Sequence, residues 1–388
     1  MGTIDAKSVI GANYGDEGKG LVTDALADEA MNTYGNCLVI CNNGGAQRSH
    51  TVVLEDGTRH AFSHFGSGTF RGADTYLSEY FILNPIIFRK EFEELVKLGY
   101  NPKVYIDKNC RISTFYESFL NQMLEQSRKT KHGSCGLGIW ETVKLYDNNN
   151  YCWRYGDFKK ADLYETMKEI EIRAYLFRHT LSKYRTSGAI TDEIYYYWKP
   201  LIEDYKIRFH FIDDLMFMID NTIESDAEVI RNYDSIIFEN GQGLLLNSDK
   251  DNVHTTPSNT GMKNIVEIEN SFSGDFYVEP IYVTRTYMTR HGAGEFKTEC
   301  AKENIGNIRV DRTNIPNPHQ GSLRYGTLDF DELITRIRND ANRGFSIFVT
   351  HTNEVPIKTY RELELLQRVA KHLYLSCSET GGYKYDYH

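Results

Sequence analysis

The sequence predicts an α/β fold with a large, mostly parallel central sheet, flanking helices and an added helical subdomain. Two observations lead to this prediction. Short, continuous apolar runs end in polar loops, as do strands that are buried on both faces of a parallel sheet. Segments with helical spacing separate these runs. No repeat or sharp change of composition divides the 388 residues, so we expect one domain over residues 1–388.

The first predicted strand ends at Val9 and Ile10, and the glycine-rich loop 11–20 (GANYGDEGKG) leads into a helix that begins near Leu21. A strand, a glycine-rich loop and a helix together present backbone N–H groups to phosphate. The loop departs from the usual P-loop because Gly20 stands where that motif has a magnesium-binding hydroxyl. Asp16 is the expected replacement ligand.

Further strands are predicted at 38–40 (LVI), 236–238 (IIF) and 346–349 (SIFV), and each precedes a polar loop. The carboxyl ends of parallel strands meet at one edge of the sheet, where ligands bind in such folds. A helix is predicted from Phe88 to Val96. Residues 157–233 are predicted to be a mostly helical insertion.

The composition excludes several classes of protein. A net charge of −10 argues against a general nucleic-acid-binding protein. Seven cysteines without a Cys-x-x-Cys pair are typical of reduced thiols. No run approaches the roughly 18 apolar residues of a membrane helix. We therefore expect a cytoplasmic protein (host cytoplasm if it is viral) that binds neither nucleic acid nor membrane.

Five motifs occur in the order in which adenylosuccinate synthetases carry them, and the chain resembles that family. They are 15–20 (GDEGKG), 44–51 (GGAQRSHT), 133–139 (GSCGLGI), 238–246 (FENGQGLLL) with 255–260 (TTPSNT), and 289–299 (TRHGAGEFKTE). The resemblance implies a P-loop-like synthetase fold, Mg²⁺, a homodimer, and a ligase that joins L-aspartate to C6 of a purine 5′-monophosphate with hydrolysis of a nucleoside triphosphate.

The resemblance also implies roles for single residues. Asp16 takes the N1 proton of the purine, His50 stabilises the transferring phosphoryl group, and the aspartate amine displaces the phosphate of a 6-phosphoryl intermediate. Lys19 completes the catalytic set, and Mg²⁺ is assigned to Asp16 and the Ser49 carbonyl.

The remaining candidate residues are divided among three substrates. The triphosphate is assigned Gly15, Glu17, Gly18, Gly20, Thr51, Thr350, His351 and Asn353. The purine monophosphate is assigned Asn13, Gln47, Ser134, Cys135, Gln242 and Thr256. The aspartate is assigned Thr298, Arg312 and Arg324, with Arg285 as a further candidate.

Several positions depart from the family's pattern. The base-recognition loop has Asn353 in place of an aspartate that accepts two hydrogen bonds from guanine. Because an amide is one donor and one acceptor, we expect a weakened preference for GTP, with ATP possible. Before Gly326 the family's run of arginines is reduced to Arg324. One of the lost arginines contacts the ribose 2′-hydroxyl, so a reason to prefer ribose over deoxyribose is missing. The fifth motif is close to the family's Thr-Arg-Val-Gly-Ala-Gly-Pro-Phe-Pro-Thr-Glu but lacks its two prolines, so we expect a looser loop there.

These departures favour the bacteriophage 2-aminoadenylosuccinate synthetases, which act on dGMP. The phage enzymes replace the catalytic aspartate with a small residue, whereas this chain keeps Asp16, which could accept a hydrogen bond from the 2-amino group. An ordinary adenylosuccinate synthetase that uses IMP and GTP is the alternative.

Two other classes are less well supported. A P-loop phosphotransferase or GTPase switch requires Ser or Thr after Lys19 and a guanine-specific aspartate, and both are missing. A non-catalytic nucleotide-binding regulator is opposed by the presence of Asp16, Lys19, His50 and Gln242.

Overall fold

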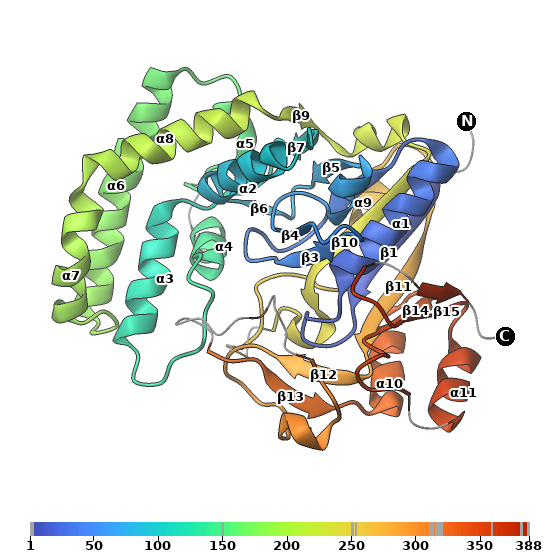
Figure 1. The fold of residues 1–388 in the computed structure, drawn as a ribbon. Helices are drawn as coiled ribbons and strands as arrows, with labels where there is room; N and C mark the ends of the chain where they lie inside the picture. The colour runs from blue at the N-terminus through green and yellow to red at the C-terminus, as the bar shows by residue number, and fades with distance from the viewer. Residues whose placement is uncertain are drawn as a thin grey trace.

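A ten-stranded sheet forms the centre of the molecule (Figure 1). The structure is a computed structural model that describes residues 4–148, 151–249, 252, 254–309, 314, 321–357, 360–380 and 383–385. The strand order is β16-β15-β14-β11-β1-β10-β2-β5-β7-β9, and all neighbours are parallel except β15 and β16. The strands are β1 (Asp5–Gly11), β2 (Leu38–Cys41), β5 (Asp74–Leu77), β7 (Val104–Asp107), β9 (Ile223–Ser225), β10 (Ser235–Gly243), β11 (Tyr277–Arg285), β14 (Ser346–Thr350), β15 (Leu373–Ser376) and β16 (Tyr383–Tyr385). The predicted α/β fold is confirmed.

Helices cover both faces of the sheet, and alternate strand residues face them. Val9 belongs to a buried cluster with Val22 and Leu26 of α1 (Lys19–Tyr34). Its neighbour Ile10 belongs to a cluster on the opposite face with residues of α9 (Lys263–Ser271), α10 (Phe330–Asp340) and α11 (Tyr360–Val369). Burial on both faces explains why these strands are continuous apolar runs in the sequence.

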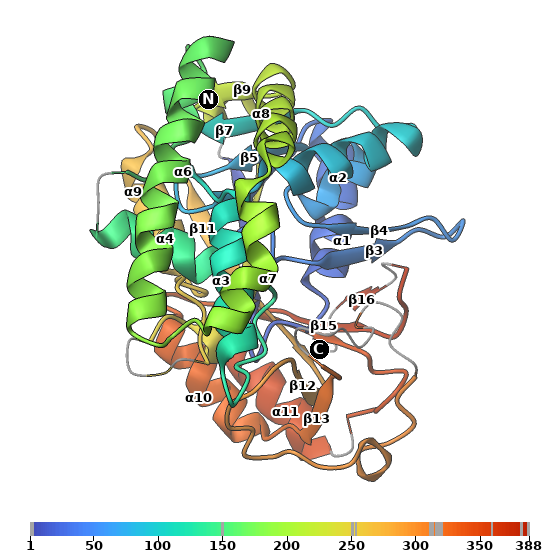
Figure 2. The ribbon, with the colours of Figure 1, turned by 90° about the vertical axis from the view of Figure 1, so that its left-hand side faces the viewer.

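A group of helices lies at one end of the molecule, next to α2 (Pro85–Lys97) (Figures 1 and 2). Within the predicted insertion 157–233, helices extend to Asp220, and the chain then adds β9 at the edge of the sheet and a short 3-10 helix, Ala227–Asn232. The group also includes α3 and α4, which precede that insertion. Its helices are α3 (Phe115–Ser127), α4 (Ile139–Asn148), α5 (Tyr155–Phe158), α6 (Leu163–Thr186), α7 (Asp192–Glu203) and α8 (Tyr205–Asp220).

Smaller strand pairs surround the carboxyl edge of the sheet. Loops after β1, β10, β2, β11 and β14 all leave the sheet at this edge, because these strands are parallel. The pairs are β3 (His50–Val53) with β4 (Arg59–Phe62), β6 (Ile82–Leu83) with β8 (Arg111–Ile112), and β12 (Tyr287–Arg290) with β13 (Arg324–Thr327). Among the described residues, every helix is too short or too polar to form a membrane span.

Candidate active site

The loop after β1 is held in shape by its own side chains. The Oε1 atom of Glu17 accepts hydrogen bonds from the backbone N–H of Asn13 at 3.0 Å and of Gly15 at 2.8 Å. The Nζ atom of Lys19 donates to the Gly15 carbonyl at 2.6 Å and lies 3.3 Å from Oε2 of Glu17. These bonds leave the Asp16 side chain partly exposed at the tip of the loop, with 21% of its surface accessible.

Two glycines allow other segments to approach this loop. Gly18 precedes α1 with a φ of 92°, a left-handed conformation that favours glycine. At Gly20, a Cβ atom would lie 2.9 Å from the Thr51 carbonyl oxygen. The hydroxyl-bearing residue of a normal P-loop therefore has no room here, because β3, which begins at His50, packs against α1.

Two cavities open on either side of the β1 loop. The β14-side cavity, of about 340 Å³, lies toward the loop that follows β14. The β10-side cavity, of about 560 Å³, lies toward the segments that follow β10. Among the predicted triphosphate residues, those that line the β14-side cavity are Gly15, Gly18, Gly20, Thr51, Thr350, His351 and Asn353, and Lys19 also lines it. Among the predicted monophosphate residues, those that line the β10-side cavity are Gln47, Ser134, Cys135, Gln242 and Thr256.

The two cavities share part of their wall. Asp16, Ser49 and His50 each line both of them. The candidate base and the candidate phosphoryl-stabilising imidazole thus lie where a ligand in one cavity would meet a ligand in the other.

The His50 side chain is fixed by a buried carboxylate that sequence analysis did not assign. Its Nδ1 atom lies 2.8 Å from Oε1 of Glu239, a residue of β10 with no accessible surface. Burial lowers the pKa of His50 to about 4, against the opposing effect of Glu239. The ring is therefore neutral at pH 7, and Nδ1–H donates to the carboxylate while Nε2 carries no hydrogen.

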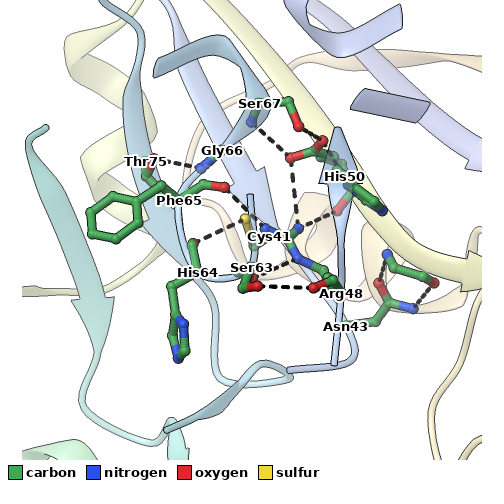
Figure 3. A network of polar contacts seen from close by, with 12 residues as sticks. Cys41, Asn43, Arg48, His50, Ser63, His64, Phe65, Gly66, Ser67 and Thr75 are labelled. Carbon is green, nitrogen blue, oxygen red and sulfur yellow. Dashed lines mark hydrogen bonds and ion pairs between the residues drawn. The ribbon is translucent and has the colours of Figure 1, made fainter. Parts of the chain in front are cut away.

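Glu239 is itself held by several donors, and Figure 3 labels its partners Arg48, His50 and Ser67. Ser67 donates to it from its backbone N–H at 3.1 Å and from its hydroxyl, and the Arg48 guanidinium lies 3.7 Å away. Burial raises the pKa of Glu239, but His50, Arg48 and Ser67 outweigh this effect and bring it to about 2. Arg48 also donates to the carbonyls of Ser63 and Phe65, so the whole network fixes the entry into β3.

Two glutamine side chains face the β10-side cavity. Both amide atoms of Gln47 are buried and have no hydrogen-bond partner within the described part of the chain. An unpaired buried amide is costly unless a ligand satisfies it, which favours the predicted contact with a nucleotide. Gln242 has a φ of 68°, which is uncommon for a residue with a side chain and is typical of binding sites.

Asp16 has a second neighbour in the β10-side cavity. The Nε2 atom of His291 lies 3.3 Å from Oδ2 of Asp16 and 2.8 Å from Oδ1 of Asn314. The backbone carbonyl of Asp16 accepts a hydrogen bond from Arg285, which lines the β14-side cavity. The candidate base is therefore constrained from both sides.

Several predicted site residues line neither cavity. The carboxylate of Glu17 is occupied by the loop's N–H groups, and the Asn13 side chain is bonded to Thr284 and Arg336. Thr298 and Arg324 also lie outside both cavities, and Arg324 binds Glu299 and the carbonyls of two glycines instead. Arg312 lies outside the described residues.

Sequence reasoning missed the contributions of Glu239 and His291. A signal for Glu239 was present, because an acidic residue directly after the apolar run IIF of a buried strand requires a partner. The signal at His291 was the replacement of valine by an imidazole. The contact between His50 and Glu239 spans 189 positions, so no local pattern predicts it.

The donor set at the shared wall fits Mg²⁺. The Asp16 carboxylate and the exposed Ser49 backbone both offer oxygen, which this ion prefers. Over the described residues, no group of three His, Cys, Asp or Glu side chains could hold a metal. Mg²⁺ is usually bound by one or two carboxylates together with substrate phosphates.

Sequence comparison places the chain in a family. The sequence profile of adenylosuccinate synthetase matches residues 8–353. The adenylosuccinate synthetase of Mesoplasma florum is 28% identical over 347 residues, which cover 87% of this chain and 75% of that protein. The enzyme of Lactobacillus acidophilus is 25% identical over 311 residues, which cover 79% and 68%. The chain belongs to the adenylosuccinate synthetase family and is a C–N bond-forming ligase.

Two solved structures share the fold. The fully ligated adenylosuccinate synthetase of Plasmodium falciparum matches with a TM-score of 0.68 at 17% identity, and covers 90% of this chain and 77% of its own. The succinoaminodeoxyadenylate synthetase of cyanophage S-2L, solved with dGMP and with dATP as an energy donor, matches with a TM-score of 0.66 at 13% identity, and covers 99% and 96%.

Proposed function

We propose that this ligase condenses L-aspartate with C6 of dGMP, through a 6-phosphoryl intermediate, with hydrolysis of a nucleoside triphosphate. The product would be 2-amino-2′-deoxy-N6-succinyladenylate, in phage purine metabolism and in the cytoplasm of the host. The observation that carries the proposal is the wall shared by the two cavities, in which Asp16 and His50 both stand.

The arrangement suits an attack by a purine oxygen on a γ-phosphate. With the purine in the β10-side cavity, Asp16 accepts the N1 proton, and the electron pair moves toward O6. That oxygen attacks the γ-phosphorus of a triphosphate in the β14-side cavity, and the nucleoside diphosphate leaves. The anionic γ-phosphate favours a protonated His50, whose Nε2–H then donates to the transferring phosphoryl oxygens.

The second step removes the phosphate again. The amine of L-aspartate attacks C6 and phosphate leaves, so one C–N bond forms and one C–O bond breaks. Mg²⁺, held by Asp16 and the Ser49 carbonyl, would neutralise phosphate charge at the shared wall. For the amino acid, Arg285 is a buried guanidinium that lines the β14-side cavity and donates a hydrogen bond to the Asp16 carbonyl.

Two observations support a deoxyguanylate substrate, and the retained Asp16 is compatible with it. In structure, the cyanophage enzyme and this chain match over almost their full lengths, 96% and 99%, whereas the match to the Plasmodium falciparum enzyme covers 77% of that protein and 90% of this chain. The sequence has lost the arginine that contacts a ribose 2′-hydroxyl in the family. The retained Asp16 can accept hydrogen bonds from both N1–H and the 2-amino group of guanine.

ATP or dATP is the favoured energy donor. Asn353 lines the β14-side cavity in place of the family's guanine-selecting aspartate. The cyanophage enzyme was solved with dATP in this role. IMP with GTP is the second candidate pair, and the observation in its favour is the Asp16 carboxylate, which ordinary family members carry.

A homodimer is also proposed. The faces of α6 and α8 expose large apolar side chains, including Tyr164, Tyr175, Tyr205 and Phe209 with 76%, 68%, 60% and 52% of their surfaces accessible. A second copy of the chain would cover this apolar surface, since contiguous exposed patches of this kind usually mark an interface.

A substrate matrix tests the proposal. The protein is incubated with Mg²⁺, L-aspartate and each pairing of IMP, GMP or dGMP with ATP or GTP, while phosphate release and product mass are followed. We expect the succinyl product of dGMP with ATP. If only IMP is converted, the second candidate, IMP with GTP, is correct and dGMP is not the substrate. If no product forms although nucleotides bind tightly, the protein is a non-catalytic regulator.

Two variants test the residues. Asp16→Ala and His50→Ala should each lower kcat by at least about 10³-fold, because both groups act on the reacting atoms. Lys97→Ala, at the exposed C-terminal end of α2, serves as the control and should retain full activity. Normal turnover in either site variant would contradict the mechanism.

A further inference from the structure

One imidazole in the β10-side cavity, that of His291, has no role in the mechanism above. His291 follows β12, lines the β10-side cavity only, and reaches the candidate base Asp16. Both groups near its Nε2 atom, Oδ2 of Asp16 and Oδ1 of Asn314, are acceptors. Nε2 must therefore carry a hydrogen, and in the neutral ring Nδ1 is left as a bare acceptor.

The loop that carries His291 is fixed rather than free to adapt. Arg290 is buried and donates to the carbonyls of Ala293 at 2.9 Å and Glu295 at 2.6 Å. From β13, Arg324 donates to the carbonyls of Gly292 at 3.1 Å and Gly294 at 2.9 Å. The loop is closed around two guanidinium groups, so the imidazole is preorganised beside Asp16.

The position of His291 indicates which part of a purine it faces. N1 lies between C6 and C2 on the edge of the ring. O6 must point toward the β14-side cavity, because it attacks the γ-phosphate there, and His50 stands on that side. With N1 at Asp16, the purine C2 substituent is directed away from the shared wall and into the β10-side cavity. His291 lines only that cavity, so it lies on the side of the C2 substituent.

We propose that His291 determines selectivity for the C2 substituent of the purine, as a positioning residue that acts through Asp16. Its Nε2–H donates to Oδ2 of Asp16 and holds the carboxylate in the orientation that accepts both N1–H and the 2-amino group of a 2-amino-6-oxopurine monophosphate. The inference rests on the proposed function and names the chemical group that this site selects.

The hydrogen-bond inventory supports this choice. A guanine edge offers N1–H and two N2–H donors, whereas hypoxanthine offers N1–H alone. A carboxylate has about four acceptor positions, so Oδ2 can accept from His291 and from the base together.

A matched pair of ligands tests the inference without requiring turnover. The full-length protein is titrated calorimetrically with dGMP and with dIMP, which differ only in the 2-amino group. In His291→Val, which removes the donor, the preference for dGMP over dIMP should fall about tenfold, equivalent to about 1.4 kcal/mol. In His291→Gln, whose amide can donate to Asp16, the preference should stay within about threefold of the unmodified chain.

Steady-state kinetics should show the same change in selectivity as the calorimetric titrations. The ratio of kcat/KM for dGMP to that for dIMP should fall in His291→Val and recover in His291→Gln, while Lys97→Ala, at the exposed end of α2, should leave both the binding ratio and the kinetic ratio unchanged. A dGMP preference that is unchanged in His291→Val, or lost equally in His291→Gln, overturns the role of the donor.

Failure of the inference can be told from failure of the proposed function. If the unmodified chain ligates dGMP but substitutions of His291 leave its preference for dGMP over dIMP unchanged, the role of His291 is wrong and the proposed function still holds. If the unmodified chain ligates none of the nucleotides, the proposed function falls, while the binding ratio still decides the role of His291. Absence of binding by both nucleotides overturns both.

Discussion

At the scale of single residues, the site depends on polar side chains that are buried beside their partners. His50 and Glu239 come from different elements, and neither could be buried alone without a large cost. Together they define which ring nitrogen of His50 is protonated and where the ring points. Glu239 lines neither cavity, so it affects the reaction only through the imidazole.

The substitution Glu239→Gln should show that Glu239 positions the His50 imidazole and does not bind substrate. The amide can present a donor to Nδ1 and so favour the opposite tautomer of His50, which should lower kcat by about 10²-fold and leave KM within about threefold. Steady-state kinetics measure both constants. Ser67→Ala removes one donor to the same carboxylate without contacting His50, and should lower kcat by less than about fivefold. An equal loss of kcat in both variants would indicate that the substitutions disturb the local structure rather than the tautomer of His50.

The presence of Asn353 leads to a separate prediction about the preference between ATP and GTP. Asn353→Asp restores an acceptor-only group, which suits the two donors of guanine, and should raise the ratio of kcat/KM for GTP to that for ATP by at least about tenfold. Asn101→Asp, which adds the same charge on an exposed loop, is the control. The base-recognition assignment fails if the unmodified chain already prefers GTP by more than about a hundredfold.

At the scale of elements, α2 stabilises the segment that supports the active-site network. Glu91 of α2 is buried and accepts hydrogen bonds from the backbone N–H groups of Ser63 and His64, both at 2.8 Å. Ser63 in turn accepts from Arg48. Burial raises the pKa of Glu91, but the imidazoles of His60 and His64 and the backbone donors outweigh burial and bring it to about 2.

Glu91→Gln should therefore destabilise the protein in a pH-dependent way. The folded pKa lies below the ordinary value of 4.5, so the contribution is fully present above about pH 4.5 and is lost as the pH falls toward 2. We expect a loss of about 2–4 kcal/mol in the free energy of unfolding at pH 7, and a smaller difference at pH 3. Urea titrations at both pH values measure this difference.

An exposed glutamate of the same helix provides the comparison. Glu93, whose partner is Arg89, is 46% accessible, and Glu93→Gln should change the free energy of unfolding by less than about 0.5 kcal/mol. A similar loss from both substitutions would mean that Glu91 acts as an ordinary surface charge.

The sequence predicted local elements better than distant contacts. Apolar runs predicted β1, β2, β10 and β14, because strands buried on both faces carry a local signal. The hairpin of β3 and β4 was not predicted, since short strands with one polar face resemble loops. Glu17 was assigned to the triphosphate because it stands in the glycine-rich loop, yet its carboxylate satisfies the N–H groups of Asn13 and Gly15 instead.

At the scale of the whole molecule, the topology brings the site together. β1 is the central strand between β10 and β11, and the two cavities open on opposite sides of its loop. The order of strands therefore separates the two cavities and places Asp16 at the wall that they share. Such a switch point is where ligands bind in doubly wound sheets.

The helical group at the far end of the molecule has a different role, which the proposed homodimer explains. In Figure 2, α8 lies beside α6. Tyr205 and Phe209 are exposed on α8 and line an apolar depression together with residues of α6. We expect the unmodified chain to sediment at twice the monomer mass. Tyr205→Glu combined with Phe209→Glu should give monomers, because charges at a buried interface cost several kcal/mol.

The control for this experiment uses another exposed tyrosine. Tyr34 ends α1 at a distance from α6 and α8 and is 44% accessible, so Tyr34→Glu should leave the sedimentation unchanged. An unmodified chain that stays monomeric at tens of micromolar would exclude a stable dimer. A dimer that survives both glutamates would place the interface elsewhere, since an apolar face that carries two buried charges cannot remain the contact.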